Sequence, residues 1–197
     1  MSAEPTLPAI MAELAAAEQA GTNDTDTDEI LALMQTAAAL PGGLEQLVER
    51  FAASPVRVLA RTLAFLLARS VSASDTPGAV APLVWSAISA LGTNDESARV
   101  NLLSAIQLLG ARGALPSTTE PVPAGLGAFL IDVLQHGEEV LDAAGPALLS
   151  LDAHGLLERL DRSQLQTIQE ILEKLAEPDN PFTRADIAAL RDRLSAA

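Results

Sequence analysis

The feature that most constrains the fold of this chain is a short pattern that recurs three times. Each copy has a proline, an aliphatic residue three positions later, and two large apolar residues at the sixth and seventh positions. The copies start at Pro41, Pro77 and Pro123. Proline is well tolerated in the first turn of a helix, because its missing N–H group would have no partner there. Each copy therefore predicts the start of a helix.

A second marker, independent of the prolines, follows within the first two copies. It consists of Arg-Val, a small hydroxyl residue and a leucine pair. The marker begins at Arg57 and occurs again 42 residues later, at Arg99. The leucine pair alone recurs after a further 40 residues, at Leu148-Leu149. One marker for each helix predicts three helical hairpins, at about residues 41–76, 77–122 and 123–151. Each hairpin exposes an apolar face that only a neighbouring hairpin can cover, so we expect the hairpins to stack.

The rest of the chain is equally suited to helices. Alanine and leucine, which favour helices most, contribute 37 and 33 of the 197 residues. Apolar residues recur at spacings of three and four in nearly every segment, so we expect an all-α fold. The predicted helices span about residues 7–20, 27–40, 43–53, 55–71, 78–91, 96–110, 123–136, 138–150, 153–160, 164–176 and 184–195.

Two of the predicted second helices resemble a known repeat family. The segments PVRVLARTLAFLL (55–67) and ARVNLLSAIQLLG (98–110) are similar to second helices of HEAT or armadillo-type repeats. The resemblance covers about 110 residues and implies a right-handed α-solenoid whose concave face binds proteins or, less often, other ligands. It brings no catalytic residues with it. The third copy departs from the family, because it lacks the arginine and carries Gly145-Pro146, which should kink or break its second helix.

The flanking segments do not match the repeat. We expect residues 1–40 and 152–197 to form capping helices, since the open ends of a solenoid need polar outer faces. The prediction is therefore a single all-α domain over residues 1–197, with its hairpin repeats at 41–151.

Charge narrows the classes of partner. The chain has 26 acidic and 12 basic residues, a formal net charge of −14, no tyrosine and no cysteine. Such a charge disfavours nucleic acids and anionic membranes, and the scarcity of aromatic residues disfavours base stacking. Without cysteine, disulfides, thiolate metal sites and cysteine nucleophiles are excluded. The first basic residue is Arg50, which leaves no positively charged start for an export signal, so we expect a cytoplasmic protein.

Candidate metal ligands do not complete a site. Asp24 to Glu29 alternates carboxylates like the opening of a calcium loop, but Glu29 occupies the position that needs glycine and Gln35 the position that needs a bidentate glutamate. A helix N-terminus explains the cluster better. His136 and His154 each precede glycine near a predicted helix end and lack a third ligand nearby. We therefore predict no metal, no cofactor and no catalytic residues.

Two further features receive structural interpretations. Trp85 lies among apolar residues at helical spacing and is expected in the core. Gly113 to Pro123 is the longest predicted non-helical connection, and we expect it to act as a hinge or a protease-sensitive site.

The predicted helix from Pro55 to Val71 carries the candidate binding site. At 100° per residue, Arg57, Arg61, Phe65 and Arg69 share one face, opposite an apolar arc formed by Val56, Leu59, Ala60, Leu63, Leu66 and Leu67. Arginine and aromatic residues are enriched at interface hot spots. The alternative is that these arginines pair with the acidic segment 1–49 of the same chain.

These observations favour a non-enzymatic helical-repeat module that binds a protein partner. One alternative is an immunity or antitoxin-type inhibitor of a basic effector, suggested by size and acidity. The other is an enzyme built on a helical-repeat scaffold, which would require a deep polar pocket. The oligomeric state is not predicted.

Overall fold

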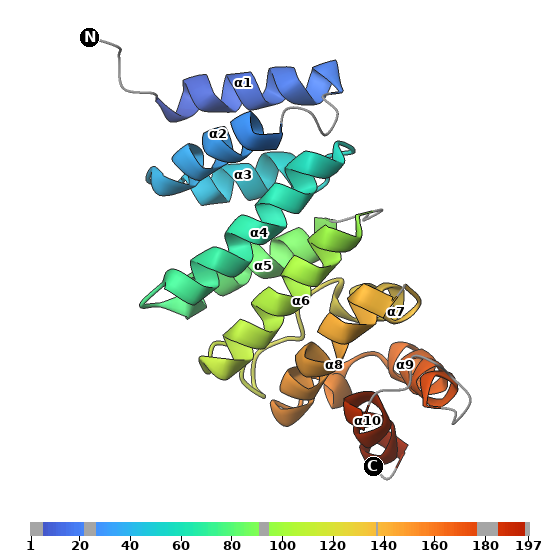
Figure 1. The fold of residues 1–197 in the computed structure, drawn as a ribbon. Helices are drawn as coiled ribbons and strands as arrows, with labels where there is room; N and C mark the ends of the chain where they lie inside the picture. Colours follow the sequence, from blue (N-terminus) through green and yellow to red (C-terminus); the bar gives the residue numbers. More distant parts are fainter. Residues whose placement is uncertain (1–5, 22–26, 91–94, 137, 177–184, 196–197) are drawn as a thin grey trace.

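The computed structural model describes residues 6–21, 27–90, 95–136, 138–176 and 185–195, and over them the chain is all-helical (Figure 1). These residues form no β-strand, which confirms the predicted fold class. The helices are α1 (Leu7–Ala20), α2 (Thr27–Ala39), α3 (Gly43–Phe51), α4 (Arg57–Ala73), α5 (Pro77–Ala90), α6 (Glu96–Ala111), α7 (Leu126–Leu134), α8 (Glu138–Ala153), the 3-10 turn η2 (Leu157–Arg159), α9 (Arg162–Leu175) and α10 (Ala185–Ser195).

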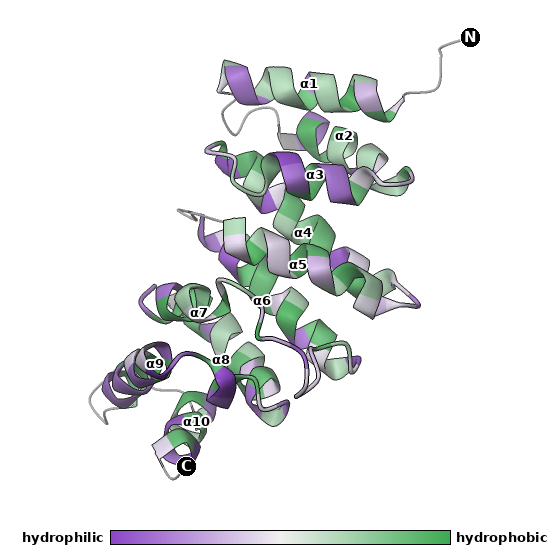
Figure 2. Ribbon diagram, turned by 180° about the vertical axis from the view of Figure 1, so that it is seen from behind, coloured by the Kyte–Doolittle hydropathy of each residue, from purple (hydrophilic) through white to green (hydrophobic). Residues whose placement is uncertain are grey.

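Alternate helices pack against one another. α4 lies along α6 and α6 along α8, while α2 packs on α4 and α10 on α8. On the other side, α3 contacts α5, α5 contacts α7, and α7 contacts α9. Figure 1 shows α4 and α6 side by side in front of α5, and Figure 2 shows α3 and α5 from behind. The helices follow one another in chain order from the N-terminal to the C-terminal end of the molecule (Figure 1).

A single cluster of buried apolar side chains joins these helices. It runs from Ile10 in α1 to Leu194 in α10, and its largest fully buried members include Phe51, Leu67 and Ile106. Leucine, isoleucine and alanine at spacings of three and four supply it, so the same pattern that predicts the helices also accounts for their packing. None of the helices in the described part of the chain is long and apolar enough to cross a membrane.

The starts of the first helices differ in part from the prediction. Pro77 is the first residue of α5, as the proline pattern predicts. α3 begins at Gly43, as its predicted range does, whereas α7 begins three residues later than predicted, and the preceding Gly42 and Gly125 have φ angles of 71° and 76°. These left-handed conformations favour glycine, and a Cβ at Gly125 would lie only 3.0 Å from Ser89 Cα. The preceding prolines therefore lie in the turns rather than in the helices.

Of the predicted kink or break at Gly145-Pro146 in the third hairpin, the break does not occur. α8 continues through Gly145 and Pro146 to Ala153, and the predicted helix at 153–160 is replaced by the end of α8 and η2. Ala144 and Leu148 are fully buried on either side of the proline, so packing holds the helix together where one backbone hydrogen bond is lost. A Cβ at Gly145 would collide with the carboxylate of Asp186, so this glycine allows α10 to approach α8.

Candidate functional site

α4 is the helix on which sequence analysis placed the binding residues, and it is buried on most of its surface. Helices α2, α5 and α6 pack against it, so the buried arc is wider than predicted. It includes Val58, Leu59, Ala60, Thr62, Leu63, Ala64, Leu66, Leu67, Ala68 and Val71. Arg57, Phe65 and Arg69 are exposed and Arg61 is partly exposed. Phe65 is 39% exposed, one of the two large apolar side chains in the described part of the chain that are so accessible. We call these four residues the arginine stripe.

The arginine stripe winds across the exposed face of α4. Its members are four residues apart, and each such step advances about 40° around a helix beyond one full turn. From Arg57 to Arg69 the stripe is about 18 Å long, at 1.5 Å per residue. Its two ends therefore reach different neighbours: Arg57 lies beside the start of α6, and Arg69 lies beside α2.

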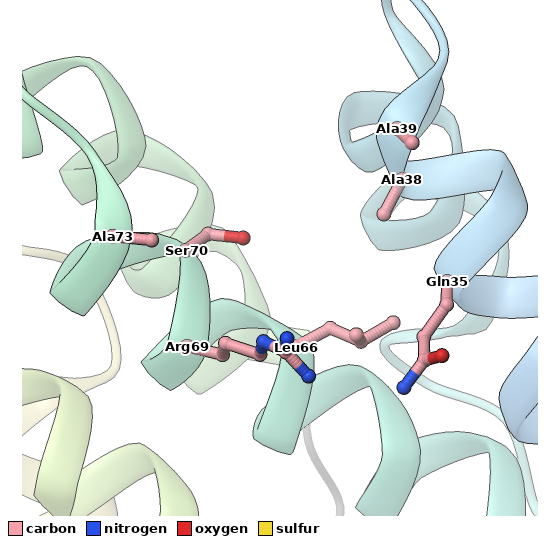
Figure 3. Close-up of a pocket in the computed structure, with 7 residues that line it drawn as sticks. All are labelled: Gln35, Ala38, Ala39, Leu66, Arg69, Ser70 and Ala73. Atoms are coloured by element: carbon pink, nitrogen blue, oxygen red, sulfur yellow. The ribbon is translucent and has the colours of Figure 1, made fainter.

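Arg69 lines a small hollow between α2 and α4 (Figure 3). The hollow has a volume of about 290 Å³. Its walls are mostly short side chains: Ala38 and Ala39 on α2, and Ser70 and Ala73 on α4. In Figure 3 the guanidinium of Arg69 and the amide of Gln35 approach the same space from opposite helices. A hollow of this size fits one side chain of a partner, with a positive charge beside it.

Arg57 lines a second, more polar hollow of about 580 Å³. The other lining residues lie at the start of α6 and just after the end of α7. They are Asp95, Glu96, Ser97, Arg99 and His136. The Asp95 carboxylate accepts a hydrogen bond of 2.8 Å from the amide of Ala98 and caps α6. The structure thus brings Arg57 and His136 to one hollow, although sequence analysis considered them separately.

Arg99 is a buried residue that sequence analysis did not recognise. It was aligned with the exposed Arg57, yet it is only 2% exposed and donates through Nε to Asp132 Oδ2 at 2.7 Å. Helical periodicity predicts this burial, because Arg99 lies on the same helical arc as the apolar Leu102, Leu103 and Ile106. The ion pair joins α6 to α7 across the two hairpins.

The two histidines take the same structural role at the ends of α7 and α8. His136 Nδ1 lies 2.6 Å from the carbonyl oxygen of Asp132, and His154 Nδ1 lies 2.8 Å from that of Ser150. A carbonyl can only accept, so Nδ1 carries the hydrogen in both rings. No group of three or more metal-ligating side chains occurs among the described residues. The acidic residues Asp24 and Asp26 lie outside the described residues.

Several other arginines of the basic segment 50–112 make internal contacts. Arg50 pairs with Glu18 of α1 at 2.9 Å, and Arg112 donates to the carbonyl oxygens of Val71 and Ser72 at 3.1 and 2.7 Å, at the end of α4. Arg50, which is not part of the arginine stripe, therefore pairs with the acidic N-terminal segment. Arg57 and Arg69 make no hydrogen bond or ion pair with another described residue.

Comparison of the chain with protein-family models, curated proteins and solved structures finds no match.

Proposed function

We propose that this chain is a HEAT-like α-solenoid that binds a protein partner without catalysis, through the exposed face of α4. The observation that supports this function most directly is the arginine stripe. On a helix whose other faces are packed, the exposed remainder combines three arginines with an accessible phenylalanine. Such a combination is typical of interface hot spots.

The packing of the helices is consistent with stacked hairpins. In a solenoid of helical hairpins each unit contacts only its neighbours, first helix against first helix and second against second. The contacts of α3, α5 and α7 on one side and of α4, α6 and α8 on the other follow this rule. On this proposal α4 and its parallel neighbours form the binding face.

The distribution of charge favours an acidic partner segment. Residues 1–49 carry a net charge of −9, residues 50–112 of +3, and residues 113–197 of −8. Because the helices follow chain order along the molecule, the basic segment lies between two acidic ends (Figure 1). An acidic segment would be attracted to the centre of this face and repelled from both ends, which also sets its position.

The two hollows suggest how the partner is held. Carboxylates of the partner would accept hydrogen bonds from Arg57 and Arg69, whose planar guanidinium groups suit bidentate pairing. One side chain would enter the hollow between α2 and α4 and contact the alanines that line it. Phe65 lies between the two ends of the stripe and would supply apolar contact area.

The first prediction tests this function by reversing one charge of the stripe. Arg69→Glu should abolish capture of a specific partner in affinity purification from the native host followed by mass spectrometry, because it places a carboxylate against an acidic segment. The control Arg162→Glu makes the same charge change at an exposed position on α9, and should retain the partner. Both variants should melt like the unchanged chain, since neither arginine has an ion pair with another described residue.

A partner that binds Arg69→Glu and the unchanged chain equally would overturn the proposal. So would a partner that is lost equally from both charge variants, because that result would reflect net charge rather than the stripe. If the captured protein is a basic toxin, the inhibitor function is the correct one.

A further inference from the structure

An apolar hollow lies beside α5, the helix behind α4 in Figure 1, and therefore away from the exposed face of α4. α5 and the connection from α6 to α7 enclose a volume of about 670 Å³. Trp85 and Pro82 of α5 face Pro116, Pro121 and Pro123 of the connection, and the remaining lining residues are alanine, glycine, leucine and valine, with one exception. We call this hollow the Trp85 pocket.

Trp85 is not the core residue that sequence analysis predicted. It packs against the core but stays partly exposed, and it forms one wall of the pocket. A partly exposed indole in the wall of an apolar hollow of several hundred Å³ is typical of a small-molecule binding site.

The walls of the pocket are held rigid without a ligand. Arg159 donates to the carbonyl oxygens of Ser117, at 3.0 Å, and of Glu120. Ser89 donates to the carbonyl oxygen of Ala124 at 2.6 Å, which ties the far end of the connection to α5. The prolines add fixed φ angles. A ligand would therefore find the pocket formed in advance and would not have to order it.

Glu120 is the exception among the lining residues, and the one charged side chain that the described residues contribute to the pocket. Its carboxylate accepts a hydrogen bond of 2.7 Å from the amide of Ser117. This backbone hydrogen bond, with help from the Ser117 side chain, holds the pKa of Glu120 below its ordinary value of 4.5. The lining therefore combines an apolar, partly aromatic surface with one exposed acidic side chain, Glu120, which the charge of Arg159 also helps to keep ionised.

We propose that the Trp85 pocket binds a small amphipathic amine, with its apolar or aromatic body against Trp85 and the prolines and its ammonium group beside Glu120. The chemistry of both parts is complementary: apolar surface to apolar surface, and cation to carboxylate. The net charge of −14 attracts cations to the molecule and repels anionic ligands of the same shape. This site does not depend on the function proposed for the arginine stripe.

The second prediction uses Trp85 as the reporter. It is the only tryptophan of the chain, which has no tyrosine, so protein fluorescence reports on this pocket alone. Titration with 3-phenylpropylamine should change the emission saturably, with an affinity about tenfold higher than for 3-phenylpropanol or 3-phenylpropionate. The preference should persist down to about pH 5, because a lowered pKa keeps the Glu120 carboxylate ionised there.

Two variants separate the charge from the cavity. Glu120→Gln keeps an acceptor for the Ser117 amide but removes the charge, so the amine should bind only as well as the alcohol. Gly78→Leu adds bulk at the lining of the pocket and should weaken binding of all three probes, while a Cβ at this position meets nothing within 4 Å and should not strain the fold. Circular dichroism of both variants checks that they fold.

The proposal is wrong if the amine gives no saturable change, or if the acid binds as tightly as the amine. It is also wrong if Glu120→Gln, correctly folded, retains the preference for the amine. The last test needs only this variant, so it holds even if Gly78→Leu fails to fold.

Discussion

Arg99 and Arg57 differ in burial, and this difference decides the role of each. Arg99 and Arg57 occupy matching positions in the two sequence repeats, yet Arg99 is buried and paired with the half-exposed Asp132, whereas Arg57 faces solvent. A buried guanidinium requires a permanent partner, because removing its water is costly. An exposed one makes only weak pairs with its own chain and is available to a partner.

The third prediction compares the two halves of the buried pair. Asp132→Ala should destabilise the fold by about 2–3 kcal/mol, because it leaves the enclosed charge of Arg99 without its carboxylate. Arg99→Met should cost less, about 1 kcal/mol, because it fills the space with apolar atoms and leaves Asp132, whose side chain is 42% exposed, to water. Urea denaturation followed by circular dichroism measures both.

The informative result is which of the two variants loses more free energy of unfolding. A larger loss for Arg99→Met than for Asp132→Ala would mean that Arg99 stabilises the fold mainly through its other contacts, and that the orphaned charge is not the dominant cost.

At the scale of elements, the connection between α6 and α7 behaves as part of the scaffold. The length and the prolines of Gly113 to Pro123 predict a hinge or protease-sensitive site. In the structure, a side chain from η2 donates to two of its carbonyl groups, and its end is tied to α5. Distant residues therefore restrain a segment whose own sequence favours irregular structure.

The fourth prediction tests this restraint. Arg159→Ala should lower the free energy of local opening by about 1 kcal/mol, which corresponds to about fivefold faster cleavage of the connection by proteinase K. Mass spectrometry of the first fragments would locate the cut between residues 113 and 123, while the melting temperature should hardly change.

Arg162→Ala is the matched control, because it removes a nearby exposed arginine that makes no bond to another described residue. Equal cleavage rates in the two variants would show that the bonds from Arg159 do not hold the connection in place.

At the scale of the whole molecule, net charge and local ion pairs have opposite effects. The chain has 14 more acidic than basic residues, so the folded state is under general electrostatic repulsion. Ion pairs such as Arg50–Glu18 and Arg193–Asp152 act against it at a few points. Salt screens both the repulsion and the ion pairs. Whether the melting temperature rises or falls with salt therefore shows which of the two dominates.

The fifth prediction is that salt stabilises this protein. Raising sodium chloride from about 20 mM to about 500 mM should raise the melting temperature by about 2–4 °C, because relief of repulsion worth about 1 kcal/mol shifts a chain of this size by that amount. Partner binding through the arginine stripe should weaken over the same range. A melting temperature that falls with salt would show that the ion pairs outweigh the repulsion.

The sequence by itself determined the helical class, most helix boundaries and the exposed face of α4. Each depends on the order of residues within one element: alanine and leucine favour helices, and a spacing of four places Arg57, Arg61, Phe65 and Arg69 on one side. A helix must bury its apolar arc whatever its neighbours are, so this information is local.

Only the tertiary structure decided which elements meet. The burial of Arg99 depends on α7 bringing Asp132 to it, and the Trp85 pocket exists because a proline-rich connection closes over α5. The continuity of α8 through Pro146 depends on packing on both sides of it. The periodicity of one helix predicts that one of its faces is buried, but it does not predict which residues cover that face. Contacts between residues tens of positions apart are therefore set by packing among helices, which no local pattern specifies.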